Sequence, residues 1–142
     1  MQTDQERLTQ HEVRKIALQF LYSKEVRPDQ SDSDLLTYIL NGRVFNQKNQ
    51  EFFNLLTRGV LDNYKTIDQK LAEFLMKTWS IERMTTIDRS VARLGAYEIL
   101  YSDTPDRVAI DEAINLSKDF SDKAAMKLIN GLLTNLIKKD EC

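Results

Sequence analysis

The stretch Ile87–Leu100, IDRSVARLGAYEIL, decides the fold together with the segment after it, Thr104–Lys118, TPDRVAIDEAINLSK. When the first segment is drawn as a helix, apolar side chains cover most of its circumference, and such a helix is stable only with neighbours around it. Thr104 and Pro105 then offer a new helix start, because proline fits the first turn of a helix and fits its interior badly. The sequence therefore predicts a buried central helix followed by a shorter one.

Helical periodicity recurs along the rest of the chain, and strand alternation does not. Apolar residues three and four positions apart predict further helices, in the ranges 13–21, 35–40, 52–60, 67–75 and 125–137. We expect a break near Asn63 and Tyr64, and a short segment through Trp79 and Ile81. The sequence thus predicts an all-α protein, a bundle of about seven helices in one domain spanning residues 1–142, with two packed halves near 1–80 and 81–142.

Composition limits the classes of protein that this chain can belong to. Its 142 residues are 42% hydrophobic and 30% charged, which suits one globular domain with its own core. The net charge of −2 argues against a wholly basic, nucleic-acid-binding surface. RNA binding would therefore need a local basic patch, and a partner that adds positive charge.

Cysteine and hydropathy patterns point to a soluble cytoplasmic protein without a membrane partner. Cys142 is the single cysteine, so the sequence predicts no intrachain disulfide and no thiolate metal site. The chain has no run of 18 apolar residues, and its first residues, MQTDQE, lack the features of a signal peptide.

The first predicted helix carries the best hint of chemistry. At 100° per residue, one third of its circumference holds several basic residues beside an aromatic ring: Arg7, His11, Arg14, Lys15, Leu18 and Tyr22. Cations bind phosphates and an exposed tyrosine stacks on an unpaired base, so this face predicts single-stranded RNA binding. The alternative interpretation is that the basic side chains only solvate the helix, while Leu18 and Tyr22 pack against a neighbour.

Sites for catalysis, cofactors or metals are not predicted. A nucleophile with an activating histidine, or a carboxylate-bridged di-metal centre, would depend on the single histidine, His11. The four glycines stand alone, so no glycine-rich loop could cradle a phosphate. Three of them interrupt helical patterns, which usually means close approach of a neighbour: Gly59, Gly95 and Gly131. Asn130 is expected to be partly buried and bonded to the backbone, with an exposed contact as the alternative.

Five motifs in register resemble the NusB family. The central one reads R-x-x-x-R-L-G-x-Y-E from Arg89, followed by V-A-I-x-E-A from Val108. The others are R-x-x-A-x-Q-x-L-Y in 14–22, F-x-x-x-L-x-x-G-V in 52–60, the segment 79–83, and K-L-I-N-G in 127–131.

The resemblance implies an all-helical antitermination factor that is not an enzyme. Members of the family join the small-subunit ribosomal protein NusE, bind the boxA element of nascent RNA, and help RNA polymerase read through terminators, chiefly in ribosomal RNA operons. It implies RNA contacts for the basic face of the first helix and for Lys127, and a NusE contact for Asp88.

Two departures from the family pattern affect this expectation. The family often has consecutive arginines near its N-terminus, whereas here Glu6 and Glu12 interrupt the basic residues. Where the family often has an acidic residue and an aromatic residue in the last helix, this chain has Ala124 and Leu128. Two alternatives stay open: the RNA-binding domain of a ribosomal RNA methyltransferase, and a helical adaptor that does not bind RNA.

Overall fold

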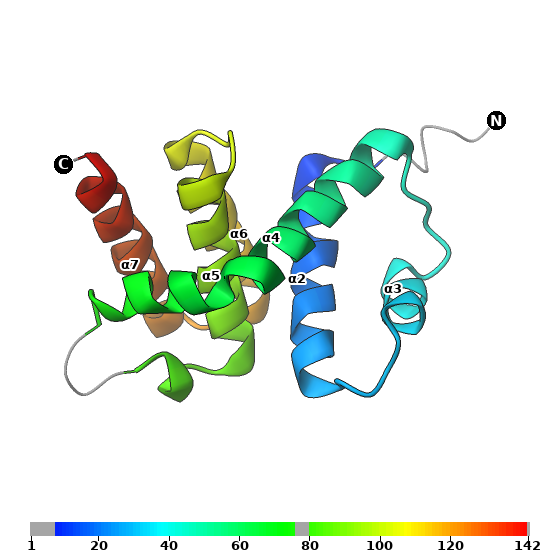
Figure 1. Ribbon diagram of the computed structural model, residues 1–142, viewed down its shortest axis with the longest axis horizontal. Helices are drawn as coiled ribbons and strands as arrows, with labels where there is room; N and C mark the ends of the chain where they lie inside the picture. Colours follow the sequence, from blue (N-terminus) through cyan, green and yellow to red (C-terminus); the bar gives the residue numbers. More distant parts are fainter. Residues whose placement is uncertain (1–7, 76–79, 142) are drawn as a thin grey trace. The chain divides into compact units, whose positions relative to one another are not determined.

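The computed structural model describes residues 8–75 and 80–141, with side chains as far as residue 137. Over these ranges the chain forms six α-helices and one 3-10 helix, with no strand (Figure 1): α2 Gln10–Val26, α3 Asp32–Leu40, α4 Gln47–Ala72, η1 Ile81–Arg83, α5 Thr86–Tyr101, α6 Asp106–Phe120 and α7 Lys123–Glu141. The all-α prediction is confirmed, and the predicted count of about seven helices is close. No helix in the described part of the chain is long and apolar enough to cross a membrane. The expected segment through Trp79 lies partly outside the described residues.

The predicted break near Asn63 and Tyr64 is wrong, because α4 runs through both residues without interruption. Asparagine often interrupts a helix, because its side chain can form hydrogen bonds with nearby backbone groups that compete with the helical ones. Here the Asn63 side-chain amide donates to the Gly59 carbonyl one turn earlier, at 2.8 Å, and the helix continues.

The chain divides into two compact units, Met1–Arg58 and Gly59–Cys142. The division falls inside α4, and not near residue 80 as the spacing of the apolar stripes suggested. The first unit holds α2, α3 and the first part of α4, and the second holds the remaining elements.

The central helix of the second unit is α5, as the sequence predicts. From Ser90 to Ile99, every residue except Arg93 is buried, and α5 packs against both α6 and α7. The helix begins where the Thr85 hydroxyl accepts a hydrogen bond from the Asp88 amide at 3.1 Å, so Thr85 is the N-cap. Capping and all-round burial therefore explain why this segment organises the second unit.

The turn from α5 to α6 is tied to a buried carboxylate. Glu98 is only 1% exposed, and the Thr104 hydroxyl donates to its carboxylate at 2.8 Å. Pro105 takes the N-cap position of α6, one residue before the first helical turn. This bond gives the buried charge a partner, which a carboxylate inside a protein needs.

Two glycines allow close packing in the second unit. A Cβ at Gly95 would lie 2.7 Å from the Leu133 side chain and 3.2 Å from Cβ of Ala113, which confirms the predicted tight helix packing. A Cβ at Gly59 would overlap the ring of Tyr97. Burial, and secondly the Glu98 carboxylate, raise the pKa of Tyr97 above its ordinary value of 10.0, so its phenol stays neutral at neutral pH. Close packing is wrong as an expectation for Gly131, because a Cβ added there would meet no other part of the structure within 4 Å.

Candidate nucleic-acid interface

The candidate RNA-binding helix, α2, begins at a capping box. The Thr9 hydroxyl accepts from the Glu12 amide at 3.1 Å, and the Glu12 carboxylate accepts from the Thr9 amide at 2.8 Å. Both bonds satisfy donors that the start of a helix leaves open. The start of α2 is therefore held in place by its own side chains.

Within the first unit, α2 packs on the start of α4 through aromatic rings. The rings of Phe20 and Phe53 meet edge to face with centroids 5.4 Å apart, and Phe45 lies 5.2 Å from Phe53. The Asn49 side-chain amide donates to the Leu8 carbonyl at 3.0 Å, which holds the chain just before α2. One side of α2 therefore packs against the start of α4 and is not available to a ligand.

Three of the predicted RNA-binding residues share one line along α2. His11 and Lys15 are half-buried and one helical turn apart, and Tyr22, seven residues beyond Lys15, is 38% exposed. An imidazole, an ammonium group and a tyrosine ring, all at least partly accessible, therefore follow one another along α2. Arg7, which is also predicted to bind RNA, lies outside the described residues.

The predicted exposed face is wrong for Arg14 and Leu18. Arg14 is 4% exposed, with its guanidinium carbon 5.2 Å from the ring centre of Phe52, and Leu18 is fully buried. Arg14 lies under α4, which covers an arc of α2 that a single apolar stripe would leave to solvent. For Leu18 the packing interpretation holds, whereas for Tyr22 the ring remains partly open.

The α7 motif presents its polar residues to solvent. Lys127 is exposed, as an RNA contact requires, and Gly131 is exposed beside it. The expectation for Asn130 is wrong: the residue is exposed, and its side-chain oxygen accepts from the Thr134 hydroxyl at 3.3 Å. The alternative of an exposed contact is therefore the one that the geometry allows.

Asp88, for which the resemblance implies a NusE contact, is half-buried and hydrogen-bonded. Its carboxylate accepts a short hydrogen bond from the Ser121 hydroxyl, which joins the start of α5 to the end of α6. Asp88 also lines a cavity of about 390 Å³. The other lining residues are Arg83, Met84, Thr85, Asp122, Ala124, Ala125 and Leu128.

This cavity brings together residues that the sequence left separate. Ala124 and Leu128, the two departures from the family pattern, line the same cavity as Asp88 although they belong to a different helix. Asp122 adds a second carboxylate, and Met84 and Leu128 add apolar surface. The positions of these residues in the sequence did not predict that they line one cavity, because the cavity depends on how α7 packs against α5.

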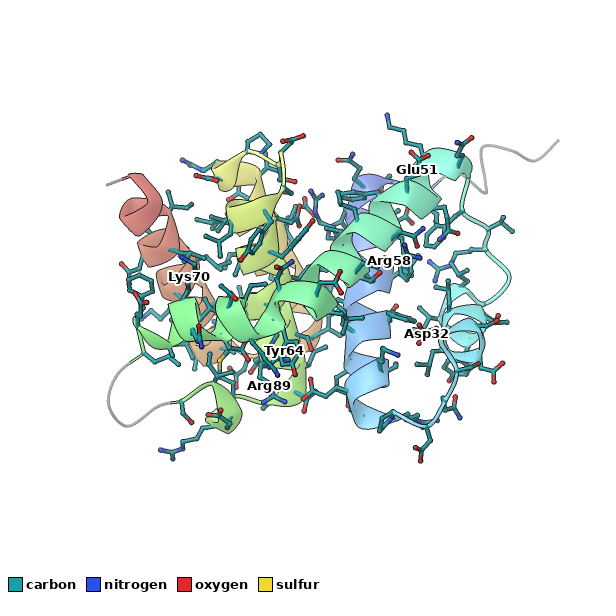
Figure 2. All side chains as sticks on the ribbon, in the orientation of Figure 1. Asp32, Glu51, Arg58, Tyr64, Lys70 and Arg89 are labelled. Carbon is teal, nitrogen blue, oxygen red and sulfur yellow. The ribbon has the colours of Figure 1, made fainter. Side chains whose placement is uncertain are left out.

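The arginines of the central motif support the fold. Arg93 makes a two-pronged ion pair with Asp68, with N to O distances of 2.9 and 2.7 Å, and its guanidinium carbon lies 5.2 Å from the ring centre of Tyr64. Arg89 donates to the Met84 carbonyl at 3.1 Å. Figure 2 labels Tyr64 and Arg89 among the side chains of this unit. These contacts tie α4 and the segment before α5 to the central helix.

The comparison with protein families decides the relationship. The NusB family model matches residues 11–138. The chain belongs to the NusB family. Curated NusB-family relatives named transcription antitermination protein NusB include one from Ligilactobacillus salivarius, 36% identical over 130 residues that cover 92% of this chain and 98% of that protein. One from Enterococcus faecalis is 34% identical and covers 93% and 91%. A third, from Lactococcus lactis, is 46% identical over 88 residues, and this stretch covers 62% of this chain and 46% of that protein.

Solved structures agree with the NusB assignment. NusB from T. maritima superposes with a TM-score of 0.82 at 31% identity, covering 94% of this chain and 93% of that one. The NusB fold also matches a crystal structure of the antitermination factors NusB and NusE in complex with dsRNA, with a TM-score of 0.76 at 23% identity. The relatives are named as antitermination proteins and not as enzymes.

Proposed function

We propose that this chain is a cytoplasmic transcription antitermination factor that binds boxA-type single-stranded RNA together with ribosomal protein NusE. In this role it promotes read-through by the RNA polymerase antitermination complex, chiefly in ribosomal RNA operons. The observation that carries the proposal is the family match over residues 11–138, which includes all of α2 after Gln10 and most of α7. No cofactor or catalytic residue is needed for it.

The RNA contacts in this proposal are His11, Lys15 and Tyr22 on α2 and Arg7 before it, in the first unit, and separately Lys127 on α7 in the second unit. Lys15 supplies positive charge for phosphates, and the 38% exposed Tyr22 ring offers a stacking surface for an unpaired base. Arg14, packed on Phe52, contributes chiefly by fixing α2 against α4.

A read-through assay tests the proposed function. Transcription by the polymerase across a terminator downstream of boxA, with NusE and the other antitermination factors present, should increase when this chain is added. The increase should vanish on a template with a scrambled boxA. Equal read-through on both templates would favour a protein adaptor that does not read RNA.

The Asp88 cavity is the proposed NusE surface. Its lining holds two carboxylates against one arginine, Arg83, and this surplus of negative charge suits a basic ribosomal protein, because opposite charge steers association. Asp88→Asn keeps an oxygen that can accept from Ser121 and removes only the charge. We expect it to slow NusE association severalfold at low salt, with a difference that shrinks as salt screens the charge. Stopped-flow or surface-based kinetics would measure the rates.

Asp106→Asn is the matched control for that experiment. Asp106 is likewise an acidic residue in the first turn of a helix, and it is exposed and outside the cavity lining. Both variants lose one carboxylate beside a helix N-terminus, which costs about 0.3 to 1 kcal/mol of stability. If the two variants slow NusE equally, the effect comes from net charge, and the partner docks elsewhere.

A further inference from the structure

The first unit has a cavity of its own, between the start of α2 and the start of α4 (Figure 1). Its volume is about 800 Å³, within the range of about 300 to 1,000 Å³ that is usual for small-ligand sites. The lining combines apolar side chains with carboxamides: Leu8, Phe52 and Leu55 with Gln10, Asn46 and Asn49. None of these residues belongs to the proposed RNA contacts or to the proposed NusE surface.

The carboxamides of the lining offer both donors and acceptors of hydrogen bonds. The Asn49 side-chain nitrogen donates to the Leu8 carbonyl at 3.0 Å, and the Asn46 side-chain oxygen accepts from the Asn49 backbone amide at 2.7 Å. These bonds hold the two side chains in place, and the second amide atom of each can bind a ligand. Gln10 adds an exposed carboxamide.

The apolar part of the lining includes an aromatic ring. Phe52 is half-buried, and the guanidinium carbon of Arg14 lies 5.2 Å from the centre of its ring. Leu55, three residues further along the same side of α4, is 51% exposed. The flat ring of a nucleobase packs on surface of this kind, and its edge carries donors and acceptors that carboxamides bind.

Charge on the lining favours an uncharged ligand. The lining holds one cation, Lys48, and one carboxylate, Glu51, and both residues are exposed. The Glu51 carboxylate accepts from the Gln47 side-chain amide at 3.3 Å (Glu51 is labelled in Figure 2). Because the two charges balance, the cavity suits a neutral polar ring better than a free phosphate or a cationic side chain.

The cavity adjoins the proposed RNA contacts on α2. Gln10 and Arg14 lie one helical turn apart on the side of α2 that faces α4. His11 and Lys15 are the residues that follow them, so these two side chains lie about 100° further round the helix. A strand whose phosphates contact His11 and Lys15 therefore passes beside the cavity.

We infer that this cavity binds one base of the single-stranded RNA that α2 holds. Phe52 and Leu55 pack on the base, the carboxamides bind its edge, and the exposed Lys48 ammonium group contacts a phosphate of the same strand. The inference rests on the proposed RNA binding, and it adds the start of α4 to the RNA surface.

The test is an NMR titration of the ¹⁵N-labelled full chain with hexaadenylate, with an abasic ribose–phosphate hexamer and with AMP. Hexaadenylate should shift the backbone amides of His11 and Lys15 and also those of Lys48, Phe52 and Leu55. The abasic hexamer should shift only the two α2 amides, because it carries phosphates and no base. AMP should bind the cavity at least about tenfold more weakly than hexaadenylate, because it lacks the phosphates that α2 holds.

The outcomes separate this inference from the proposed function. If hexaadenylate shifts the α2 amides and leaves the cavity amides unmoved, the inference is overturned and the proposed RNA contacts stand. If neither set moves, the proposed RNA contacts fail together with the inference. Equal affinity for AMP would make the cavity a site for free nucleotides, and shifts of the cavity amides on adding NusE without RNA would assign it to the protein partner. Either result overturns the inference.

Phe52→Leu separates a base contact from a structural role. The variant removes the aromatic ring and keeps an apolar side chain beside Arg14. We expect it to weaken hexaadenylate binding at least about fivefold, which corresponds to 1 kcal/mol of stacking, and to leave affinity for the abasic hexamer unchanged. Phe45→Leu is the matched control, since Phe45 is also a half-buried phenylalanine of the first unit but lies outside the cavity lining. Equal weakening of both ligands in the Phe52 variant would mean that it acts through the position of α2, which contradicts the inference.

Lys48→Ala tests the phosphate contact with a variant at an exposed position. It should lower the slope of log affinity for hexaadenylate against log salt concentration by about 1. Lys65→Ala is the control, since Lys65 is also an exposed lysine of α4 and lies in the other unit. A slope that stays the same in both variants would remove Lys48 from the path of the RNA and contradict the inference.

Discussion

Replacing Gly59 by alanine is expected to lower the free energy of unfolding by about 3 kcal/mol, at the upper end of the usual range for overpacking a core. The added methyl group would overlap the ring of Tyr97, which is 4% exposed and stacks on Tyr101 with centroids 5.8 Å apart. The buried ring has little room to move away, so α4 and α5 must shift. Urea unfolding followed by circular dichroism would measure the change.

Gly131→Ala is the matched control for that prediction. Gly131 also lies inside a helix, but nothing lies within 4 Å of an added Cβ and the residue is exposed. Here alanine should stabilise by up to about 1 kcal/mol through its better helix propensity. If both variants change stability by the same small amount, Tyr97 does not pack on Gly59 as described.

Tyr22→Ala is expected to weaken boxA RNA binding by about 1 to 3 kcal/mol, which is the usual contribution of one stacked base. Because Tyr22 is 38% exposed, the melting temperature should change little. Fluorescence anisotropy with a labelled boxA RNA would measure the affinity. Tyr101→Ala is the control in the other unit, since Tyr101 is also an exposed tyrosine, at 43%, and this variant should leave RNA affinity unchanged. A large loss of stability in the Tyr22 variant would instead assign that ring to the core.

The central helix could be predicted from sequence because its signals are local and agree with one another. Apolar residues around the whole circumference of 87–100 require burial, and Thr85 or Thr86 supplies the cap. The structure shows this helix buried between α6 and α7, with Thr85 as the cap. The smallness of Gly95 was predictable for the same reason, since a glycine inside a strong helical pattern needs a close neighbour.

The candidate site was harder to predict because exposure depends on neighbours distant in sequence. A helical projection places Arg14 beside His11 and Lys15, but Phe52 covers Arg14. Asp88 carries the charge that the motif suggested, yet the Ser121 hydroxyl binds it. Apolar periodicity shows only that one side of a helix packs, and it does not show how many neighbours the helix has.

Titration of boxA RNA with this chain, in the absence and presence of NusE, tests the central claim most directly. The net charge of −2 and the few accessible cations on α2 predict weak binding by the chain alone. NusE should tighten binding at least about tenfold, a coupling of roughly 1.4 kcal/mol, and added salt should weaken the complex steeply. Binding that is equally strong for a scrambled RNA of the same length, or that is unchanged by NusE, would contradict the account.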